Sequence, residues 1–304
     1  MSREQRKTVA DALRAAGSGF APSAISEMRD NFASMMSRFA IPPVSTTQVR
    51  VAERPAVLVE DLSDPRPGTI LYFHGGSFVL GSPTTAMGLT ASLVARTRMR
   101  AISVDYRLAP EHPFPAAIED CLAAYRSILE EGIPAQSIAF AGDSAGGGLA
   151  VTTTLAARAA GLPLPAAILA FSPGLDLTRT GASVTDKADR DPFFTREGLD
   201  YTGGLYLAGQ SPDQDLASPA VLADLSGFPP MLLQVGTDEL MLDDSVRLAD
   251  RAREADVDVI LDITANVPHV FQSLSGQLEE ADWALDRAAL FLTQHVDAIF
   301  TDEG

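Results

Sequence analysis

The chain has 304 residues, a formal net charge of −17 at pH 7 and 46% hydrophobic residues. Nucleic acids and anionic membranes are both bound through cationic surfaces, so this charge argues against either as a partner and favours a soluble protein. The apolar content can supply a substantial core, and no internal repeat or long linker divides the sequence.

The N-terminal region is predicted to form a pair of helices. Ser2 and Gln5 have the spacing of a capping box at the start of residues 2–16. Residues 3–14 are polar and charged with no apolar core of a signal peptide, and no run elsewhere approaches a membrane span, so we expect a cytoplasmic protein. Apolar side chains recur on one face of the second helix: Met28, Phe32, Met35, Met36 and Phe39.

Strand-like and helix-like segments then alternate, which predicts a single α/β domain over residues 1–304. Apolar strand candidates without polar alternation suit a mostly parallel sheet with helices on both faces. The strand candidates outside the motifs below are residues 48–52, 56–59 and 100–105, and the helix candidates are residues 85–98 and 116–130.

A glycine turn follows the apolar run at residues 69–73. The sequence there is HGGSF, and glycine allows backbone N–H groups to approach a substrate oxygen closely. We therefore predict an oxyanion hole built from this turn, at Gly75, Gly76 and Ser77, together with the amide of Ala145.

Residues 142–146 read GDSAG between an apolar run and a helix-like stretch. Small residues on both sides of Ser144 permit the sharp strand-to-helix turn that holds a nucleophilic serine at the end of a sheet. We predict that Ser144 is the nucleophile. Such a serine requires a base, and the base requires an orienting acid.

His269 is the favoured base among the four histidines of the chain. It ends a short loop, residues 265–268, after a strand-like run at 257–264, where a catalytic loop is expected to leave an α/β sheet. The other histidines have structural explanations, because His74 lies in the glycine turn, His112 in a proline-rich loop and His295 on an amphipathic stretch.

Asp238 is the favoured orienting acid because it follows the strand-like run 231–235 through Gly236 and Thr237. The chain order Ser, Asp, His is the one expected of an α/β-hydrolase. Alternatives remain among the neighbouring acids. They are Glu239, which is adjacent, Asp243 or Asp244, which suit a helix start, and Asp176, which follows another strand candidate.

Together these motifs resemble the bacterial hormone-sensitive-lipase-like carboxylesterases, an α/β-hydrolase family. The resemblance covers roughly residues 45–300 and implies Ser144, Asp238 and His269 as nucleophile, acid and base. It also implies oxyanion donors at Gly76, Ser77 and Ala145, although Ser77 stands where the family usually has a third glycine. The motifs are HGG at 74–76, DYRLAPEHPFPA at 105–116, GDSAG at 142–146, GTDE at 236–239 and PH at 268–269.

The resemblance further implies a helical cap formed by about residues 1–43 and 177–211, and a possible homodimer through the strand at 257–264. The expected activity is hydrolysis of short- to medium-chain carboxylic esters through an acyl-enzyme. Alternatives are a lactone, carbamate or acetyl-amide hydrolase with the same residues, or a ligand-binding protein that has lost catalysis. No cofactor is expected, because paired-histidine, cysteine-cluster and phosphate-loop motifs are missing from the sequence.

Overall fold

The computed structural model describes residues 2–16 and 24–296. Its centre is an eight-stranded sheet in the order β1-β2-β4-β3-β5-β6-β7-β8. β2 is antiparallel to β1 and β4, and the remaining neighbours are parallel, which confirms the predicted mostly parallel sheet. The strands are β1 (Ser45–Val51), β2 (Arg54–Glu60), β3 (Thr69–Phe73), β4 (Arg100–Val104), β5 (Ile138–Asp143), β6 (Ala167–Phe171), β7 (Met231–Asp238) and β8 (Val259–Pro268).

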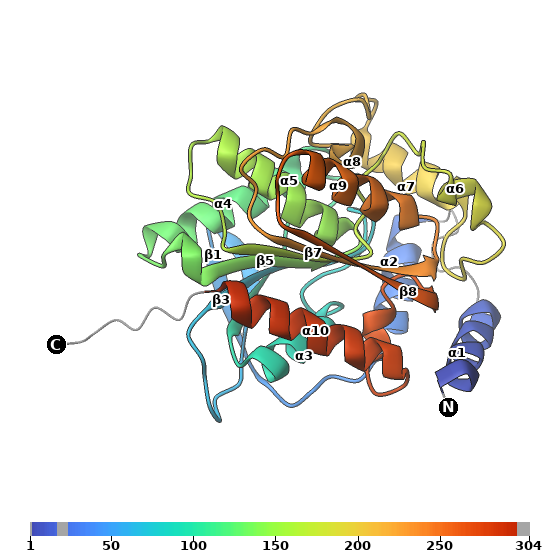
Figure 1. Ribbon diagram of the computed structural model, residues 1–304, viewed down its shortest axis with the longest axis horizontal. Coiled ribbons are helices and arrows are strands. Elements are labelled where there is room, and N and C mark those ends of the chain that lie inside the picture. The colour runs from blue at the N-terminus through green and yellow to red at the C-terminus, as the bar shows by residue number, and fades with distance from the viewer. Residues whose placement is uncertain (1, 17–23, 297–304) are drawn as a thin grey trace.

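Helices cover both faces of this sheet (Figure 1). The helices α3 and α10 lie on one face, and α4, α5 and α9 lie on the other. The helices are α1 (Ser2–Ala16), α2 (Ile25–Met36), α3 (Met87–Thr97), α4 (Ala116–Glu130), α5 (Ala145–Ala159), α6 (Ser183–Asp186), α7 (Arg196–Leu207), α8 (Pro219–Leu222), α9 (Leu242–Glu254) and α10 (Glu279–His295), with short 3₁₀ turns η1 (Ala135–Ser137) and η2 (Phe271–Leu274).

The core is divided by the sheet into two apolar layers. Successive side chains of a strand point to opposite faces, so Leu71 and Phe73 of β3 join the layer under α4 and α5. Ile70 and Tyr72 of the same strand join the layer under α3 and α10. Because both faces are covered, β3 and β5 are buried along their full length, and this explains their unbroken apolar sequences.

The last two strands are longer at their C-terminal ends than the sequence predicts. β7 continues to Asp238 and β8 to Pro268, and the two pair as far as Asp238 with Pro268 after an irregularity beyond Gly236. The predicted loop at 265–268 is therefore wrong. Asp238 is part of a strand, and His269 follows a strand directly.

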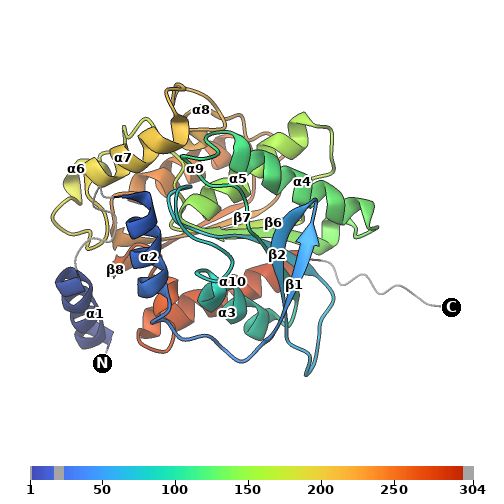
Figure 2. The ribbon, with the colours of Figure 1, turned by 180° about the vertical axis from the view of Figure 1, so that it is seen from behind.

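Two segments lie beyond the carboxyl ends of these strands. Figures 1 and 2 place α2, α6 and α7 at the same end of the sheet, towards which β7 and β8 run. Arg29 attaches α2 to the body of the protein. Its guanidinium donates to both carboxylate oxygens of Glu111 at 2.8 and 2.7 Å and to the carbonyl oxygens of Val79 and Ala109.

Within residues 2–16 and 24–296, the helices are too short or too polar to cross a membrane.

Candidate active site

Ser144 occupies a strained turn between β5 and α5. Its backbone has φ 53° and ψ −120°, in the left-handed half of conformational space that side chains other than glycine rarely adopt. Glycine is required beside it, because a Cβ at Gly146 would lie 1.9 Å from the carbonyl oxygen of Phe73, and one at Gly142 would lie 2.4 Å from the Gly146 carbonyl. The GDSAG segment thus forms the sharp strand-to-helix turn that its sequence predicts.

The glycine turn after β3 lies against this elbow and carries unpaired amides. Among the described residues, the N–H groups of Gly76, Ser77 and Ala145 have no hydrogen-bond acceptor. Gly75 differs, since its N–H donates to the Asp143 carboxylate at 3.1 Å. Of the four residues predicted for the oxyanion hole, Gly75 is therefore not available as a donor, and it shapes the turn.

Ser77 adopts the left-handed conformation, with φ 55°. Gly76 precedes it with φ 124°, and a Cβ at that position would lie 2.3 Å from the carbonyl oxygen of Leu80. The turn therefore requires glycine at 76 but accommodates serine at 77 with backbone strain. The amide of Ser77 remains available despite the change of side chain.

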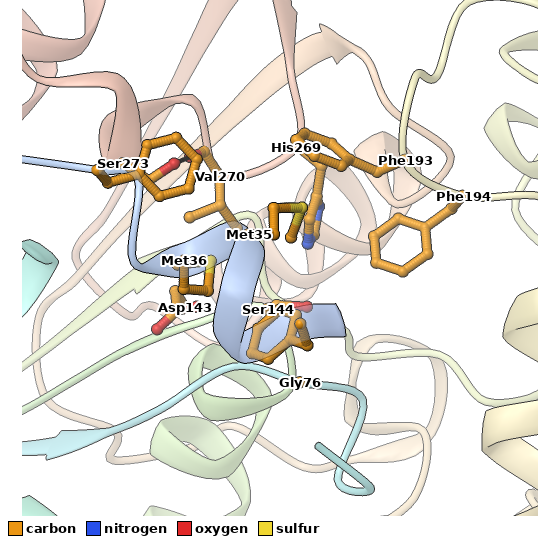
Figure 3. A pocket seen from close by; sticks show the side chains of 12 residues that line it. Met35, Met36, Gly76, Asp143, Ser144, Phe193, Phe194, His269, Val270 and Ser273 are labelled. Atoms are coloured by element: carbon orange, nitrogen blue, oxygen red, sulfur yellow. Dashed lines mark hydrogen bonds between the residues drawn. The ribbon is translucent and has the colours of Figure 1, made fainter. Parts of the chain in front are cut away.

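His269 is buried at the end of β8 and faces the elbow. Figure 3 shows its imidazole extending towards Ser144, and both residues line one pocket. Nδ1 lies 2.6 Å from Oε2 of Glu239, while Nε2 has no hydrogen-bond partner among the described residues. The ring is thus fixed at one nitrogen, and the other is available towards the pocket.

The acid that contacts His269 is Glu239, and the prediction of Asp238 is wrong. Asp238 instead forms an ion pair with Arg190 at 2.8 Å and is 19% exposed, whereas the Glu239 side chain is completely buried. The other carboxylate oxygen of Glu239, Oε1, accepts hydrogen bonds from the hydroxyl of Ser172 at 2.8 Å and from the amide of Gly236 at 2.7 Å. Glu239 is the adjacent alternative that the sequence leaves open.

The physical reason for this difference is where β7 ends. Asp238 is still within the β7–β8 ladder, opposite Pro268, and its side chain lies towards Arg190. Glu239 is the first residue after the strand, and its carboxylate contacts His269. Because β7 extends as far as Asp238, the carboxylate that contacts His269 is that of the next residue, Glu239.

Neighbouring carboxylates raise the pKa of His269 above its usual value. Burial by itself would lower this pKa, but Glu239 opposes it through its charge and hydrogen bond, and Asp191 and Asp143 add to that effect. Burial in turn raises the pKa of both Asp191 and Asp143 to about 6. The imidazolium formed during proton transfer is therefore stabilised by a cluster of acids around the ring.

Asp191 connects the segment above the pocket to the loop that carries Glu239. One carboxylate oxygen accepts from the amides of Phe193 and Phe194 at 2.8 and 2.9 Å, and the other accepts from the Leu240 amide at 2.8 Å. Phe194 in turn packs edge-on against the imidazole of His269, with ring centres 4.8 Å apart. The local sequence at 191–194 does not reveal this role, because the Leu240 amide lies 49 positions away.

The pocket shared by Ser144 and His269, here called the first pocket, is mostly apolar. It encloses about 430 Å³ of empty space, counting its opening to solvent. Its walls come from α2, the glycine turn, the elbow, the segment before α7 and the end of β8. The lining residues are Phe32, Met35, Met36, Phe39, Gly76, Asp143, Ser144, Phe193, Phe194, His269, Val270 and Ser273.

The alternative acids have other partners. Asp176 pairs with Arg247 at 3.1 Å, Asp243 accepts from the Ser183 amide, and Asp244 accepts from two backbone amides. Neither Asp243 nor Asp244 caps α9 with its side chain, because both lie in the first turn of that helix.

The alternative histidines also lie apart from this chemistry. Burial lowers the pKa of His74 to about 4, and its ring stacks on Tyr106 at 4.1 Å. His112 is exposed, and His295 packs against Phe291 on α10. Across residues 2–16 and 24–296, no group of three His, Cys, Asp or Glu side chains is arranged to hold a metal ion.

Comparison with known proteins agrees with this geometry. A family model described as the alpha/beta hydrolase fold matches residues 70–273. An acetyl-hydrolase of Streptomyces hygroscopicus is 42% identical over 224 residues, covering 74% of this chain and 75% of the relative. An esterase of Acinetobacter venetianus is 34% identical over 275 residues, covering 90% of this chain and 89% of the relative.

Solved structures extend the match over nearly the full chain. The crystal structure of an esterase from the bacterial hormone-sensitive lipase family superposes with a TM-score of 0.92 at 36% identity, covering 97% of this chain and 99% of that one. The chain therefore belongs to the α/β-hydrolase family, within its bacterial hormone-sensitive-lipase branch.

Proposed function

We propose that the protein hydrolyses carboxylic esters, with Ser144 as nucleophile, His269 as general base and Glu239 as the acid that orients it. The observation that carries this proposal is the buried 2.6 Å contact between Glu239 and Nδ1 of His269, on a ring that shares its pocket with a strained serine. A histidine held in this way beside a serine is the arrangement needed to activate a hydroxyl at neutral pH.

Glu239 determines which ring nitrogen carries the proton. Its carboxylate accepts the Nδ1 proton of His269, so the lone pair lies on Nε2 and can take the hydroxyl proton of Ser144. As the serine Oγ attacks the ester carbonyl carbon, the carbonyl π electrons move onto oxygen. Nε2 of the resulting imidazolium then donates its proton to the alcohol oxygen as the carbon–oxygen bond breaks, which leaves an acyl-enzyme.

The unpaired amides of Gly76, Ser77 and Ala145 stabilise the negative charge that develops on the carbonyl oxygen. They are fixed by the glycine turn and by the start of α5, so no reorganisation is needed during the reaction. Each such donor typically stabilises the transition state by about 2.7–4 kcal/mol. A water molecule activated by His269 then attacks the acyl carbon, and the same amides serve again before Ser144 is released.

We infer short- to medium-chain acyl groups as the substrates. The Streptomyces hygroscopicus relative is named an acetyl-hydrolase, and this name supports a small acyl group. Lactone, carbamate or acetyl-amide hydrolysis by the same residues is the alternative, because the pocket and not the fold selects the leaving group. The complete arrangement of Ser144, His269 and Glu239 argues against a binding protein that has lost catalysis.

A substrate panel tests this proposal. The purified protein is assayed with p-nitrophenyl esters from acetate to dodecanoate, and with a lactone, a carbamate and an N-acetyl amide. We expect the highest kcat/KM on short or medium esters. Faster turnover of the amide or lactone would favour the alternative reaction, and no turnover of any ester by the folded protein would refute the proposal.

We further propose that residues 1–43 and 177–211 act as a cap over Ser144. The described part of these segments contributes Phe32, Met35 and Phe194 to the first pocket, whereas residues 1 and 17–23 lie outside the described residues. Removal of residues 1–36 is expected to abolish substrate selectivity.

We also propose a homodimer through β8. This strand is at the edge of the sheet, and its side chains Ile260 and Ile263 are 53% and 45% exposed. An edge strand with exposed apolar residues can pair with a second copy. Light scattering of the protein and of an Ile263→Lys variant tests this, since a monomeric wild type would refute it. The cytoplasmic location remains a prediction, to be checked by cell fractionation.

A further inference from the structure

A second pocket is also lined by Ser144. It encloses about 340 Å³ of empty space, counting its opening to solvent, and His269 is not among its lining residues. Ser77 and Ala145, whose amides surround the serine, form one wall. Leu199 and Met241 supply apolar surface, and the guanidinium-bearing side chain of Arg179 completes the lining. An otherwise largely apolar pocket beside the nucleophile thus contains a cation.

The neighbouring acids leave Arg179 without a carboxylate partner. Among the described residues, no carboxylate oxygen lies within ion-pair distance of Arg179, and Nη1 donates only to the backbone oxygen of Asp176 at 3.3 Å. The Asp176 carboxylate is bound by Arg247, and Asp244 is bound by the amides of Leu175 and Asp176. A guanidinium has five N–H donors, so most of those of Arg179 are available to a ligand.

The backbone of Arg179 lies in a strained turn. Its φ is 55°, in the left-handed region that an arginine rarely adopts. The Asp176 carboxylate fixes this turn by accepting from the amides of Thr178 and Thr180 on either side of Arg179. Burial lowers the pKa of Arg179, while the charges of Asp244, Asp176 and Asp200 oppose that effect. Strained residues fixed in this way occur preferentially at functional sites.

The position of His269 decides which part of an ester enters each pocket. The leaving alcohol must receive a proton from Nε2 of His269, and this residue lines the first pocket only. The acyl chain extends from the same carbonyl carbon and takes the remaining space, beside Ser77 and Ala145.

We propose that the second pocket binds acyl chains that end in a carboxylate, with Arg179 as the residue that binds this group. The substrate class is then half-esters of short dicarboxylic acids, of the form alkyl ester at one end and free carboxylate at the other. This inference rests on the proposed ester hydrolysis and specifies which acyl groups the enzyme prefers. A planar guanidinium suits a carboxylate because two parallel N–H···O bonds can form.

The test compares two methyl esters that differ only at the distal end. Methyl hydrogen glutarate carries a carboxylate there, and methyl glutaramate carries a neutral amide of the same shape. Their hydrolysis is followed by pH-stat titration, and the ratio of the two kcat/KM values is compared between wild type and Arg179→Gln. We expect wild type to prefer the carboxylate, and this ratio to fall roughly ten- to a hundredfold in the variant, as for loss of a charge-assisted hydrogen bond.

Two variants separate direct contact from general charge. Arg196→Gln removes a cation on the same cap that is outside the second pocket and about half exposed, so the preference should persist. Arg179→Lys keeps the charge but loses the planar fork, so the preference should be partly retained. Equal loss in Arg179→Gln and Arg196→Gln would overturn the assignment of Arg179. Because each ratio is measured within one protein, partial loss of folding cancels.

A second pair of substrates tests the placement of the acyl chain. In 4-acetoxybutanoate and 4-acetoxybutanamide the charged or neutral end belongs to the alcohol, and we expect no Arg179-dependent preference. A preference on this pair alone would overturn the acyl assignment. Equal rates on both pairs, from an enzyme that hydrolyses p-nitrophenyl acetate, would refute the inference and leave ester hydrolysis standing. Inactivity on p-nitrophenyl acetate as well would refute the proposed function itself.

Discussion

Replacing Glu239 by glutamine should disable the enzyme by changing which nitrogen of His269 carries the proton. The amide of Gly236 is a fixed donor to the Glu239 carboxylate at 2.7 Å. In Glu239→Gln, the single oxygen of the new side chain is best satisfied by this donor, so its NH₂ group is directed towards Nδ1 of His269. Nδ1 must then accept a hydrogen bond, and the ring proton moves to Nε2, which can no longer take a proton from Ser144.

The expected loss follows from this change of tautomer. Triads in other serine hydrolases lose roughly 10⁴-fold in kcat when the orienting acid is neutralised or removed. We expect a loss of this order for Glu239→Gln, because the contact is short, at 2.6 Å, and completely buried. The matched control is Asp238→Asn. Its partly exposed ion pair with Arg190 should contribute less than about 1 kcal/mol, so activity should stay within a few-fold of wild type.

The pH dependence of kcat/KM on p-nitrophenyl acetate supplies a second readout. His269 must be neutral to accept a proton, so the rate falls as pH drops through its pKa, which the surrounding acids raise above the usual value. Glu239→Gln removes the largest raising contribution, and the acidic limb should therefore move to lower pH. A large loss in Asp238→Asn together with near-normal activity in Glu239→Gln would refute this reasoning.

Three further substitutions have defined outcomes. Ser77→Gly relieves the left-handed strain and keeps the amide donor, so thermal denaturation should show a higher Tm with activity within a few-fold of wild type; a hundredfold loss would contradict this. Burial raises the pKa of Asp244 to about 7, so wild type loses stability as pH rises from about 4 to 7, and urea unfolding of Asp244→Asn should lack this part of the decline. Met35→Ala widens the first pocket, so kcat/KM for benzyl acetate relative to ethyl acetate should rise; an unchanged ratio would place the alcohol elsewhere.

The parts of the site that local sequence determines could be predicted. The GDSAG and HGGSF segments each combine glycine with a strand end, and the steric demands of those turns follow from a few adjacent residues. Helix α4 is found at its predicted boundaries, because its apolar periodicity is regular. His269 could be chosen over the other histidines from its place after a strand.

The choice between Asp238 and Glu239 could not be made in this way. It depends on how β7 and β8 pair beyond Gly236, which is a tertiary feature. A shift of one residue in this pairing turns a side chain to the opposite face of the sheet. The roles of Asp191 and Arg179 were missed for a similar reason. Each role depends on residues from a distant segment. Asp191 accepts a hydrogen bond from the Leu240 amide, and Arg179 lines the second pocket together with Met241.

The most direct test of the account is active-site labelling with a fluorophosphonate. The reagent phosphonylates a serine only where a base activates its hydroxyl, so it reports the convergence of Ser144, His269 and Glu239 without assuming a substrate. Peptide mass mapping should place the adduct on Ser144, and the Ser144→Ala variant should remain unlabelled and inactive. An adduct on any other residue, or undiminished labelling and turnover in Ser144→Ala, would contradict the account.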